Sequence, residues 1–228
     1  MSAFPTLIAV AHGTRSPAGR RQIQELASAV ARRRPGLDVR LCYVDVQEPK
    51  VAEVVPAVGD AVVVPLLLSC GYHVRVDIAD AVKSTRIPVS PPLGPDPVFL
   101  ASLRRNLPRA DAVVLASAGS SDPLWVEGIR EVAAQLPGRV ELGYTSGSGP
   151  RVKDVVAMLR TEGAKTVAVA AYLLAEGLFY RTLHGAGADA VTPPLCHDPA
   201  VADLVLSRFD TAIKSNTTDT PVGAGSRG

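Results

Sequence analysis

Aromatic side chains and net charge are both scarce in this chain of 228 residues. Phe, Trp and Tyr make up 4% of it, too few to supply the exposed rings on which nucleic-acid bases stack. The formal net charge is only +2, which gives no electrostatic case for a nucleic-acid partner. We therefore expect no binding to DNA or RNA.

Long apolar runs are missing as well. No stretch approaches the roughly 20 apolar residues needed to cross a bilayer, and the N-terminal segment MSAFPTLIAVAHG lacks the basic start of a signal peptide. The three cysteines, Cys42, Cys70 and Cys196, form no CxxC pair and have no zinc-ribbon spacing. The prediction is a soluble cytoplasmic protein that keeps its thiols reduced and does not bind membranes.

The chain does contain a regular alternation of apolar runs and helical patterns. In the first half, residues 7–11, 39–46, 61–68 and 87–89 have the composition of strands. Pairs such as Ser16-Pro17 between these runs are typical of helix starts. We predict an α/β fold with mainly parallel four-stranded sheets flanked by helices.

The pattern occurs twice. AHGTRSP (11–17) matches SAGSSDP (117–123), and VPLLLSCGYHV (64–74) matches AAYLLAEGLFY (170–180), both at an offset of about 106 residues. VSPPLGPDP (89–97) matches VTPPLCHDP (191–199) at a slightly shorter offset. We predict two tandem similar domains, residues 1–108 and 109–214, followed by a small, polar, disordered tail at 215–228.

Two of the four histidines follow predicted central strands. His12 comes directly after the first strand and His73 comes shortly after the third, at the strand ends where open α/β sheets place their ligands. At the offset of the repeat, His12 corresponds to Ala118 and His73 to Phe179. Both histidines are present in the first half and both are missing from the second, which indicates that they act together.

A pair of imidazoles at neighbouring strand ends can bind divalent iron, cobalt, nickel or zinc. Asp45, after the second strand, is placed to add a carboxylate ligand, with Glu48 close behind. Such a set leaves coordination positions open, which suits metal that is handed on. Plainer interpretations remain: His12 as a cap of the next helix, His73 as a surface residue of a first helical turn, and Asp45 as a loop carboxylate.

Other chemistries have weaker signals. The chain has neither GxGxxG nor a Walker A loop, and Ala11 stands where a phosphate-binding RHG motif needs arginine. Ser117 and Ser120 form no GxSxG motif, and Cys70 has no evident oriented base beside it. His184 and His197 have no partner pattern, and we place them at the solvent or at the seam between the domains.

Three segments together resemble the sirohydrochlorin chelatase family, the CbiX/SirB-type class II chelatases, in its long two-domain form. They are LIAVAHGTRSPAG (7–19), YVDVQEPKVAEVV (43–55) and VVVPLLLSCGYHVRVDI (62–78). The resemblance implies a lyase that inserts Fe2+ or Co2+ into sirohydrochlorin, with His12 and His73 as the metal-binding and catalytic pair. The family usually has glutamate in the second-strand motif where this chain has Asp45.

The resemblance also implies that the metal is a substrate and that no permanent cofactor is held. Insertion releases two pyrrole protons, and a neutral histidine can both bind a metal and accept a proton. We favour Fe2+, which gives sirohaem, because sirohaem is widely needed. Insertion of Co2+ for cobalamin synthesis and a non-catalytic metal- or tetrapyrrole-binding module are the alternatives.

The substrate carries many peripheral carboxylates, so its site is expected to offer cations and backbone donors. Arg15 and Arg75 flank the two histidines, although solvated helix-end arginines would look the same in sequence. Gly13, Gly71 and Tyr72 complete the expected substrate contacts. We expect a monomer, because the second domain takes the place of a dimer partner.

Overall fold

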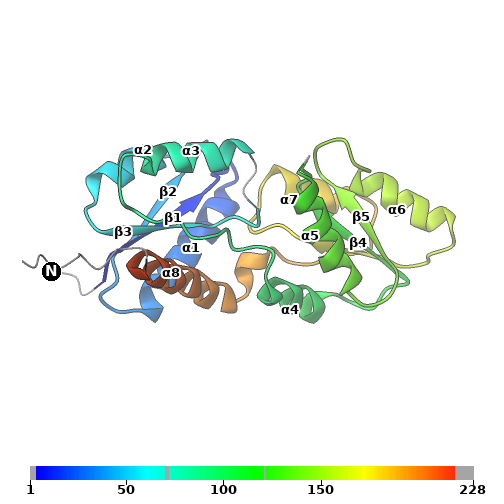
Figure 1. Ribbon diagram of the computed structural model, residues 1–228. Coiled ribbons are helices and arrows are strands. Elements are labelled where there is room, and N and C mark those ends of the chain that lie inside the picture. Colours follow the sequence, from blue (N-terminus) through cyan, green and yellow to red (C-terminus); the bar gives the residue numbers. More distant parts are fainter. Residues whose placement is uncertain (1–3, 70–71, 121, 219–228) are drawn as a thin grey trace, which may run out of the picture.

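The computed structural model describes residues 4–69, 72–120 and 122–218, and for residues 72–75, 217 and 218 it describes the backbone alone. Strands and helices alternate along both halves of the chain, as the sequence predicts (Figure 1). In order, the elements are β1 (Thr6–Ala11), α1 (Pro17–Arg33), β2 (Val39–Tyr43), α2 (Val51–Val54), the 3-10 helix η1 (Val55–Ala57), β3 (Ala61–Pro65), α3 (Tyr72–Val82), α4 (Pro97–Asn106), β4 (Ala112–Ser117), α5 (Pro123–Ala134), β5 (Val140–Tyr144), α6 (Val152–Thr161), β6 (Val167–Ala171), α7 (Leu178–His184), β7 (Ala190–Val191), the 3-10 helix η2 (Leu195–His197) and α8 (Ala200–Thr218).

All the strand pairs run parallel, in two separate sheets. The first sheet has the order β2-β1-β3 and the second has the order β5-β4-β6-β7. The α/β class is therefore confirmed, but the first sheet has three strands where four were expected. Residues 87–89 contribute only one isolated bridge, between Val63 and Val89, since Pro88 has no N–H to extend a ladder and Pro91 follows.

Helix starts follow the expected chemistry. The Oγ of Ser16 accepts a hydrogen bond from the Gly19 N–H, and Pro17 is the first residue of α1. Asp96 and Asp122 cap α4 and α5 in the same way, each followed by a proline. A proline fits this place because the first helical N–H groups have no partner within the helix.

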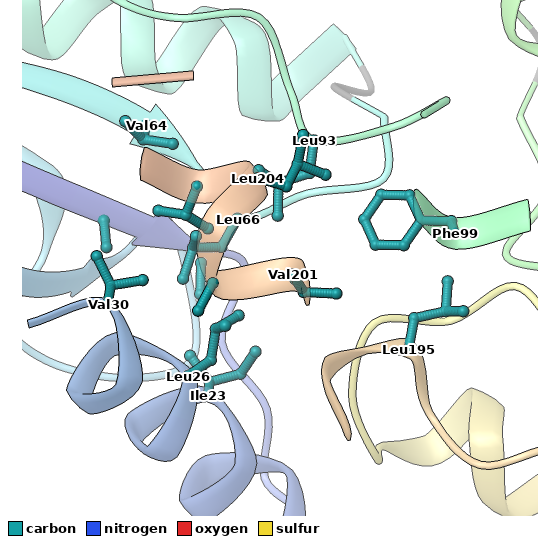
Figure 2. Close-up of a cluster of buried hydrophobic side chains, with 14 of the residues drawn as sticks. Ile23, Leu26, Val30, Val64, Leu66, Leu93, Phe99, Leu195, Val201 and Leu204 are labelled. Carbon is teal, nitrogen blue, oxygen red and sulfur yellow. The ribbon is translucent and has the colours of Figure 1, made fainter. Parts of the chain in front are cut away.

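The last helix of each repeat packs against the other repeat. Helix α8 lies on α1 and β3, while Phe99 of α4 meets Tyr172 edge-to-face with 6.1 Å between ring centroids (Figure 1). Figure 2 shows the buried side chains that result, which come from α1, β3, α4, η2 and α8 and from the segments that follow β3 and precede α4. They include Ile23, Leu26, Val30, Val64, Leu66, Leu93, Phe99, Leu195, Val201 and Leu204.

This exchange joins the two repeats through one continuous core. The opposite faces have cores of their own, formed with α2 and α3 on the first sheet and with α6 and α7 on the second. The domain limits 1–108 and 109–214 describe the sequence repeat and stay a prediction. The tail was expected from residue 215, but α8 continues to Thr218, with the Ser215 Oγ donating to the Thr211 carbonyl; residues 219–228 lie outside the description.

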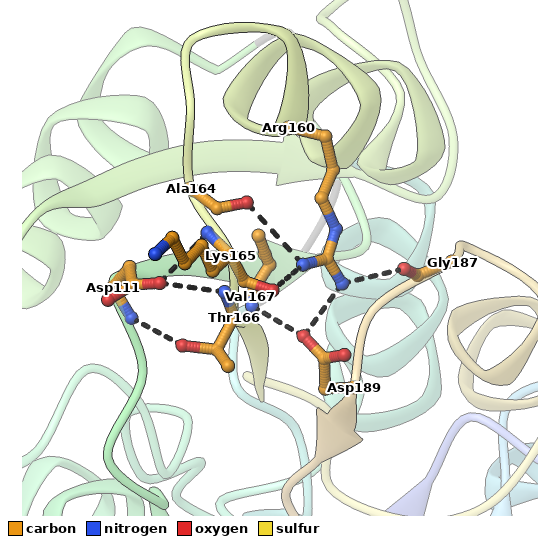
Figure 3. A network of polar contacts seen from close by, with 8 residues as sticks. All are labelled: Asp111, Arg160, Ala164, Lys165, Thr166, Val167, Gly187 and Asp189. Atoms are coloured by element: carbon orange, nitrogen blue, oxygen red, sulfur yellow. Dashed lines mark hydrogen bonds and ion pairs between the residues drawn. The ribbon is translucent and has the colours of Figure 1, made fainter.

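A polar network closes the end of the second sheet where its strands begin (Figure 3). Arg160 of α6 donates to the carboxylate of Asp189 over 2.7 Å, and that carboxylate accepts the Val167 N–H. Asp111 accepts the N–H groups of Lys165 and Thr166. Hydrogen bonds to backbone N–H groups, with help from Thr166 and Arg160, lower the pKa of both carboxyl groups.

In the described part of the chain, no helix combines the length and the apolar character that a membrane span requires.

Candidate functional site

His12 lies where β1 ends, and its imidazole is exposed. The Asp45 N–H donates to the His12 carbonyl over 3.0 Å, so the ends of β1 and β2 stay paired at this point. Gly13 has a φ of 98°, and a Cβ atom there would lie 2.1 Å from the Asp45 carbonyl oxygen. Only glycine allows this close approach. The sequence-predicted residues His12, Gly13 and Asp45 are thus brought together.

The loop that follows His12 is held from both sides. The Oε1 of Gln47 accepts the Thr14 N–H over 2.9 Å, and the Nε of Arg20 donates to the Thr14 carbonyl over 2.9 Å. Helix α1 is capped by Ser16, which overturns the interpretation of His12 as that cap. The imidazole is therefore free of a capping duty and sits on a fixed backbone. Arg15 lies in the same loop with an exposed side chain.

Asp45 is an exposed carboxylate, with 72% of its side chain accessible. Its Oδ1 accepts the Val46 N–H over 2.7 Å and lies 4.0 Å from the Nζ of Lys50. Val46 has a φ of 64°, an uncommon conformation for a β-branched residue. Both contacts use Oδ1, so Oδ2 is the oxygen that Asp45 can best offer to a metal.

The third strand leads to the same edge of the sheet. Beyond β3, the Leu66 N–H donates to the Val10 carbonyl over 2.8 Å, and α3 begins at Tyr72. His73 and Arg75 therefore belong to the first turn of α3, but the side chains of Tyr72, His73 and Arg75 lie outside the description, as does all of Gly71. Within the described side chains, no three His, Cys, Asp or Glu residues form a metal-binding group.

The second repeat keeps the same backbone arrangement without the same side chains. Gly119 has a φ of 89°, and a Cβ atom there would lie 2.3 Å from the Ser146 carbonyl oxygen. The Ser146 N–H donates to the Ala118 carbonyl over 3.0 Å, as Asp45 does to His12. Ser146 is therefore the structural counterpart of Asp45. Phe179 is the second residue of α7, as His73 is of α3. Ala118, Ser146 and Phe179 therefore stand in place of the three candidate ligands His12, Asp45 and His73.

The other described histidines and cysteines take structural places. His184 is exposed and packs its ring against Tyr180, with 5.1 Å between centroids. The Nε2 of His197 lies 3.1 Å from the Gln22 amide nitrogen, at the seam between α1 and η2, as expected. Burial raises the pKa of the Cys42 and Cys196 thiols to about 12, which leaves them unreactive at neutral pH. Cys70 lies outside the described residues.

Sequence reasoning overlooked Gln47, whose amide holds the Thr14 N–H. A single polar loop residue carries no periodicity, so only the proximity of the two loops reveals its role. Burial raises the pKa of the Tyr43 phenol, and the nearby Gln47 amide opposes this shift.

The fold occurs in solved structures. SirB from Bacillus subtilis with Fe3+ shares 23% identity with the chain at a TM-score of 0.73, covering 93% of this chain and 97% of that one. The sirohydrochlorin chelatase SirB from Bacillus subtilis subspecies spizizenii, in complex with cobalt, shares 20% identity at a TM-score of 0.73, with coverages of 94% and 97%.

A third structure, a multi-domain protein from Deinococcus radiodurans with structural similarity to chelatases, has a TM-score of 0.64 and 20% identity, covering 90% of this chain and 55% of that one. No curated protein matches the chain. The CbiX family model matches it twice, over residues 6–110 and 112–212, one match for each repeat. The chain therefore belongs to the CbiX family.

Proposed function

We propose that the protein is a sirohydrochlorin chelatase that inserts a divalent metal into sirohydrochlorin with release of two protons. The observation that carries this proposal is the exposed imidazole of His12 on a fixed loop beside Asp45, in a chain of the CbiX family. His73, in the first turn of α3, is the proposed second ligand.

The chemistry requires a site that holds a metal ion and then releases it. A neutral imidazole binds transition ions through one ring nitrogen, at a distance of about 2.1 Å for zinc. The Nδ1 of His12 lies 3.4 Å from the Gly13 carbonyl oxygen, which makes Nε2 the nitrogen that we assign to the metal. As the macrocycle nitrogens replace the protein ligands, the freed imidazole can accept a pyrrole proton. Asp45 is the proposed third ligand, through Oδ2.

Peripheral carboxylates of the substrate need positive charge. We propose that Arg15 and Arg75 bind them, with Gly13, Gly71 and Tyr72 lining the same strand ends. Arg15 is an exposed residue of the loop that follows His12, which supports this proposal.

Iron is the metal that we favour, and cobalt is the alternative. Imidazole and carboxylate ligands accept both ions, and the two similar SirB structures contain Fe3+ and cobalt respectively. We also propose that the protein works as a monomer, because its second repeat supplies the second sheet. Sedimentation at equilibrium tests this, and a dimer mass would contradict it.

The test of the function is a turnover measurement. Sirohydrochlorin is mixed without oxygen with Fe2+ or Co2+ and a small fraction of the protein, and its absorbance is followed. A chelatase consumes many substrate molecules per chain, faster with Fe2+ than with Co2+ if iron is the physiological metal. Stoichiometric metal binding without turnover would instead identify a binding module and contradict the proposal.

A further inference from the structure

The second repeat exposes large apolar side chains at its own strand ends. Leu124 is 83% exposed and Leu178 is 66% exposed, the two highest values among the large exposed apolar residues in the described part of the chain, and Phe179 is 39% exposed. Single exposed apolar residues are ordinary. These three, however, all lie in the first turns of α5 and α7, the two helices that follow central strands β4 and β6.

The corresponding positions of the first repeat are Ala18, which is small, Tyr72, which is a proposed substrate contact, and His73, which belongs to the proposed metal site. Helices α1 and α5 both begin at a proline, so Leu124 corresponds to Ala18. Helices α3 and α7 begin at Tyr72 and Leu178, so Phe179 corresponds to His73. The second repeat has thus lost its metal ligands and carries bulky apolar side chains along the same edge.

Contacts between the repeats hold the start of α7 against the loop that carries His12. Gln22 of α1 accepts the Glu176 N–H over 2.7 Å and donates to the Glu176 carboxylate over 2.9 Å. A Cβ atom at Gly177 would lie 3.4 Å from the Oγ1 of Thr14. Leu178 is the next residue, so its side chain starts within this contact region. Figure 1 places α7 on the side of the second sheet that faces the first.

Helix α5 lies beside Pro95, and the neighbouring Gly94 lies beside the connection between β3 and α3. Gly128 of α5 lies close to Pro95, since a Cβ atom added at Gly128 would be 3.6 Å from the Pro95 Cγ. Gly94 lies close to Leu68, since a Cβ atom added at Gly94 would be 2.6 Å from the Leu68 carbonyl oxygen. Leu68 belongs to the connection between β3 and α3. Leu124 lies one helical turn before Gly128 on α5.

We propose that Leu124, Leu178 and Phe179 form an apolar platform that receives the flat face of the tetrapyrrole. This inference rests on the proposed function. Metal enters the ring through one face, so the ring must be held by contacts that leave that face turned to His12. Uncharged side chains suit the conjugated face, whereas the peripheral carboxylates need the arginines of the first repeat. The second repeat would thus serve as the substrate support.

The test measures binding of metal-free sirohydrochlorin, so that metal delivery plays no part. Leu124→Ser, Leu178→Ser and Phe179→Ser are titrated with the tetrapyrrole by absorbance, each alone and all three together. We expect about tenfold weaker tetrapyrrole binding for each leucine variant, in line with loss of one buried apolar side chain. Phe179→Leu should bind the tetrapyrrole more tightly than Phe179→Ser, because leucine restores an apolar contact. Met158→Ser on the outer helix α6 is the matched control, since Met158 is 40% exposed and lies away from this edge.

The outcomes separate this inference from the proposed function. Weaker ring binding in the platform variants, with Met158→Ser unchanged, supports the platform even if the wild-type protein shows no turnover. Unchanged binding in all three variants overturns the platform even if the wild-type protein is an active chelatase. If the platform variants change only the self-association of the protein, measured by sedimentation, the three side chains form an interface between copies of the chain. The inference would then be wrong.

Discussion

His12 combines an exposed imidazole with a backbone that is held on both sides. Its carbonyl pairs with Asp45, and the next residues are fixed through Gln47 and Arg20. An exposed ring can exchange water, metal and substrate ligands, while the fixed loop keeps its direction. Single residues of the neighbouring loop therefore decide how well the proposed metal site is organised.

Gln47→Leu tests this organisation. The substitution leaves the Thr14 N–H without its acceptor, and we expect the free energy of unfolding to fall by about 1–2 kcal/mol. Metal insertion should fall as well, because the loop after His12 loosens. Gln47→Glu keeps an acceptor oxygen and is the matched control. Urea unfolding and the turnover assay measure both effects; equal behaviour of the two variants would show that the hydrogen bond is unimportant.

At the residue scale, part of the site could be predicted from which residues directly follow the predicted strands. His12, Gly13, Arg15 and Asp45 follow their strands, and parallel strands bring such residues to one edge of the sheet. The contact between Gln47 and Thr14 joins residues that are distant in the chain, and no sequence pattern signals it. The side-chain positions of His73 and Arg75 lie outside the description, so their roles stay predictions.

At the scale of elements, the turn after β1 depends on Gly13. Gly13→Ala should destabilise the fold strongly, because the new Cβ would lie 2.1 Å from a carbonyl oxygen in addition to the cost of a positive φ. Gly36→Ala is the matched control, since Gly36 has a φ of 88° and nothing within 4 Å of the added atom. We expect about 1–2 kcal/mol for Gly36→Ala, and clearly more for Gly13→Ala. Equal losses in urea unfolding would contradict this account.

The elements themselves were largely predictable, but their partners were not. Buried parallel strands are continuous apolar runs, and Ser-Pro and Asp-Pro pairs mark helix starts, so both features can be read from local sequence. The repeat shows that α4 corresponds to α8, yet both helices have the same apolar spacing whichever sheet they cover. Which sheet each helix covers depends on the length and direction of the connections, which a local pattern does not encode.

At the scale of the whole molecule, the exchange of α4 and α8 makes each repeat incomplete. A fragment of residues 1–108 lacks α8, so the faces of α1 and β3 that α8 covers would be exposed to water. We expect this fragment to be unfolded or to pair with a second copy that supplies the missing helix. Circular dichroism and sedimentation test this, and a stable folded monomer would contradict it.

Two ion pairs join the C-terminal end of α1 to α8, Arg33 with Asp203 and Arg34 with Asp210, and the second makes this packing sensitive to pH. The Arg34 guanidinium donates to both oxygens of Asp210, over 2.5 and 2.8 Å, and holds the pKa of that carboxyl below its usual value. Because the pKa of Asp210 is lower in the folded than in the unfolded chain, the ion pair stabilises the fold at pH values above the unfolded-state pKa, near ~3.9. This stabilisation is lost as the pH falls through the folded-state pKa.

Asp210→Asn should therefore lower the free energy of unfolding at pH 7 by less than about 1 kcal/mol, since the Asp210 side chain is 41% exposed and screened by solvent. The difference from the wild-type protein should shrink towards zero when urea unfolding is repeated at increasingly acid pH, as the pH falls through the lowered pKa of Asp210. A difference that stays the same at both pH values would show that the charge is not the cause.

The central claim, that one metal-delivery site survives in the first repeat, is tested most directly by the four histidines. The rate of metal insertion into sirohydrochlorin is measured for His12→Ala, His73→Ala, His184→Ala and His197→Ala, with thermal unfolding as the check on folding. We expect the first two variants to lose at least about a hundredfold in rate and the last two to stay close to the wild-type rate. Near-normal rates in His12→Ala or His73→Ala, or equal losses in all four, would contradict the account.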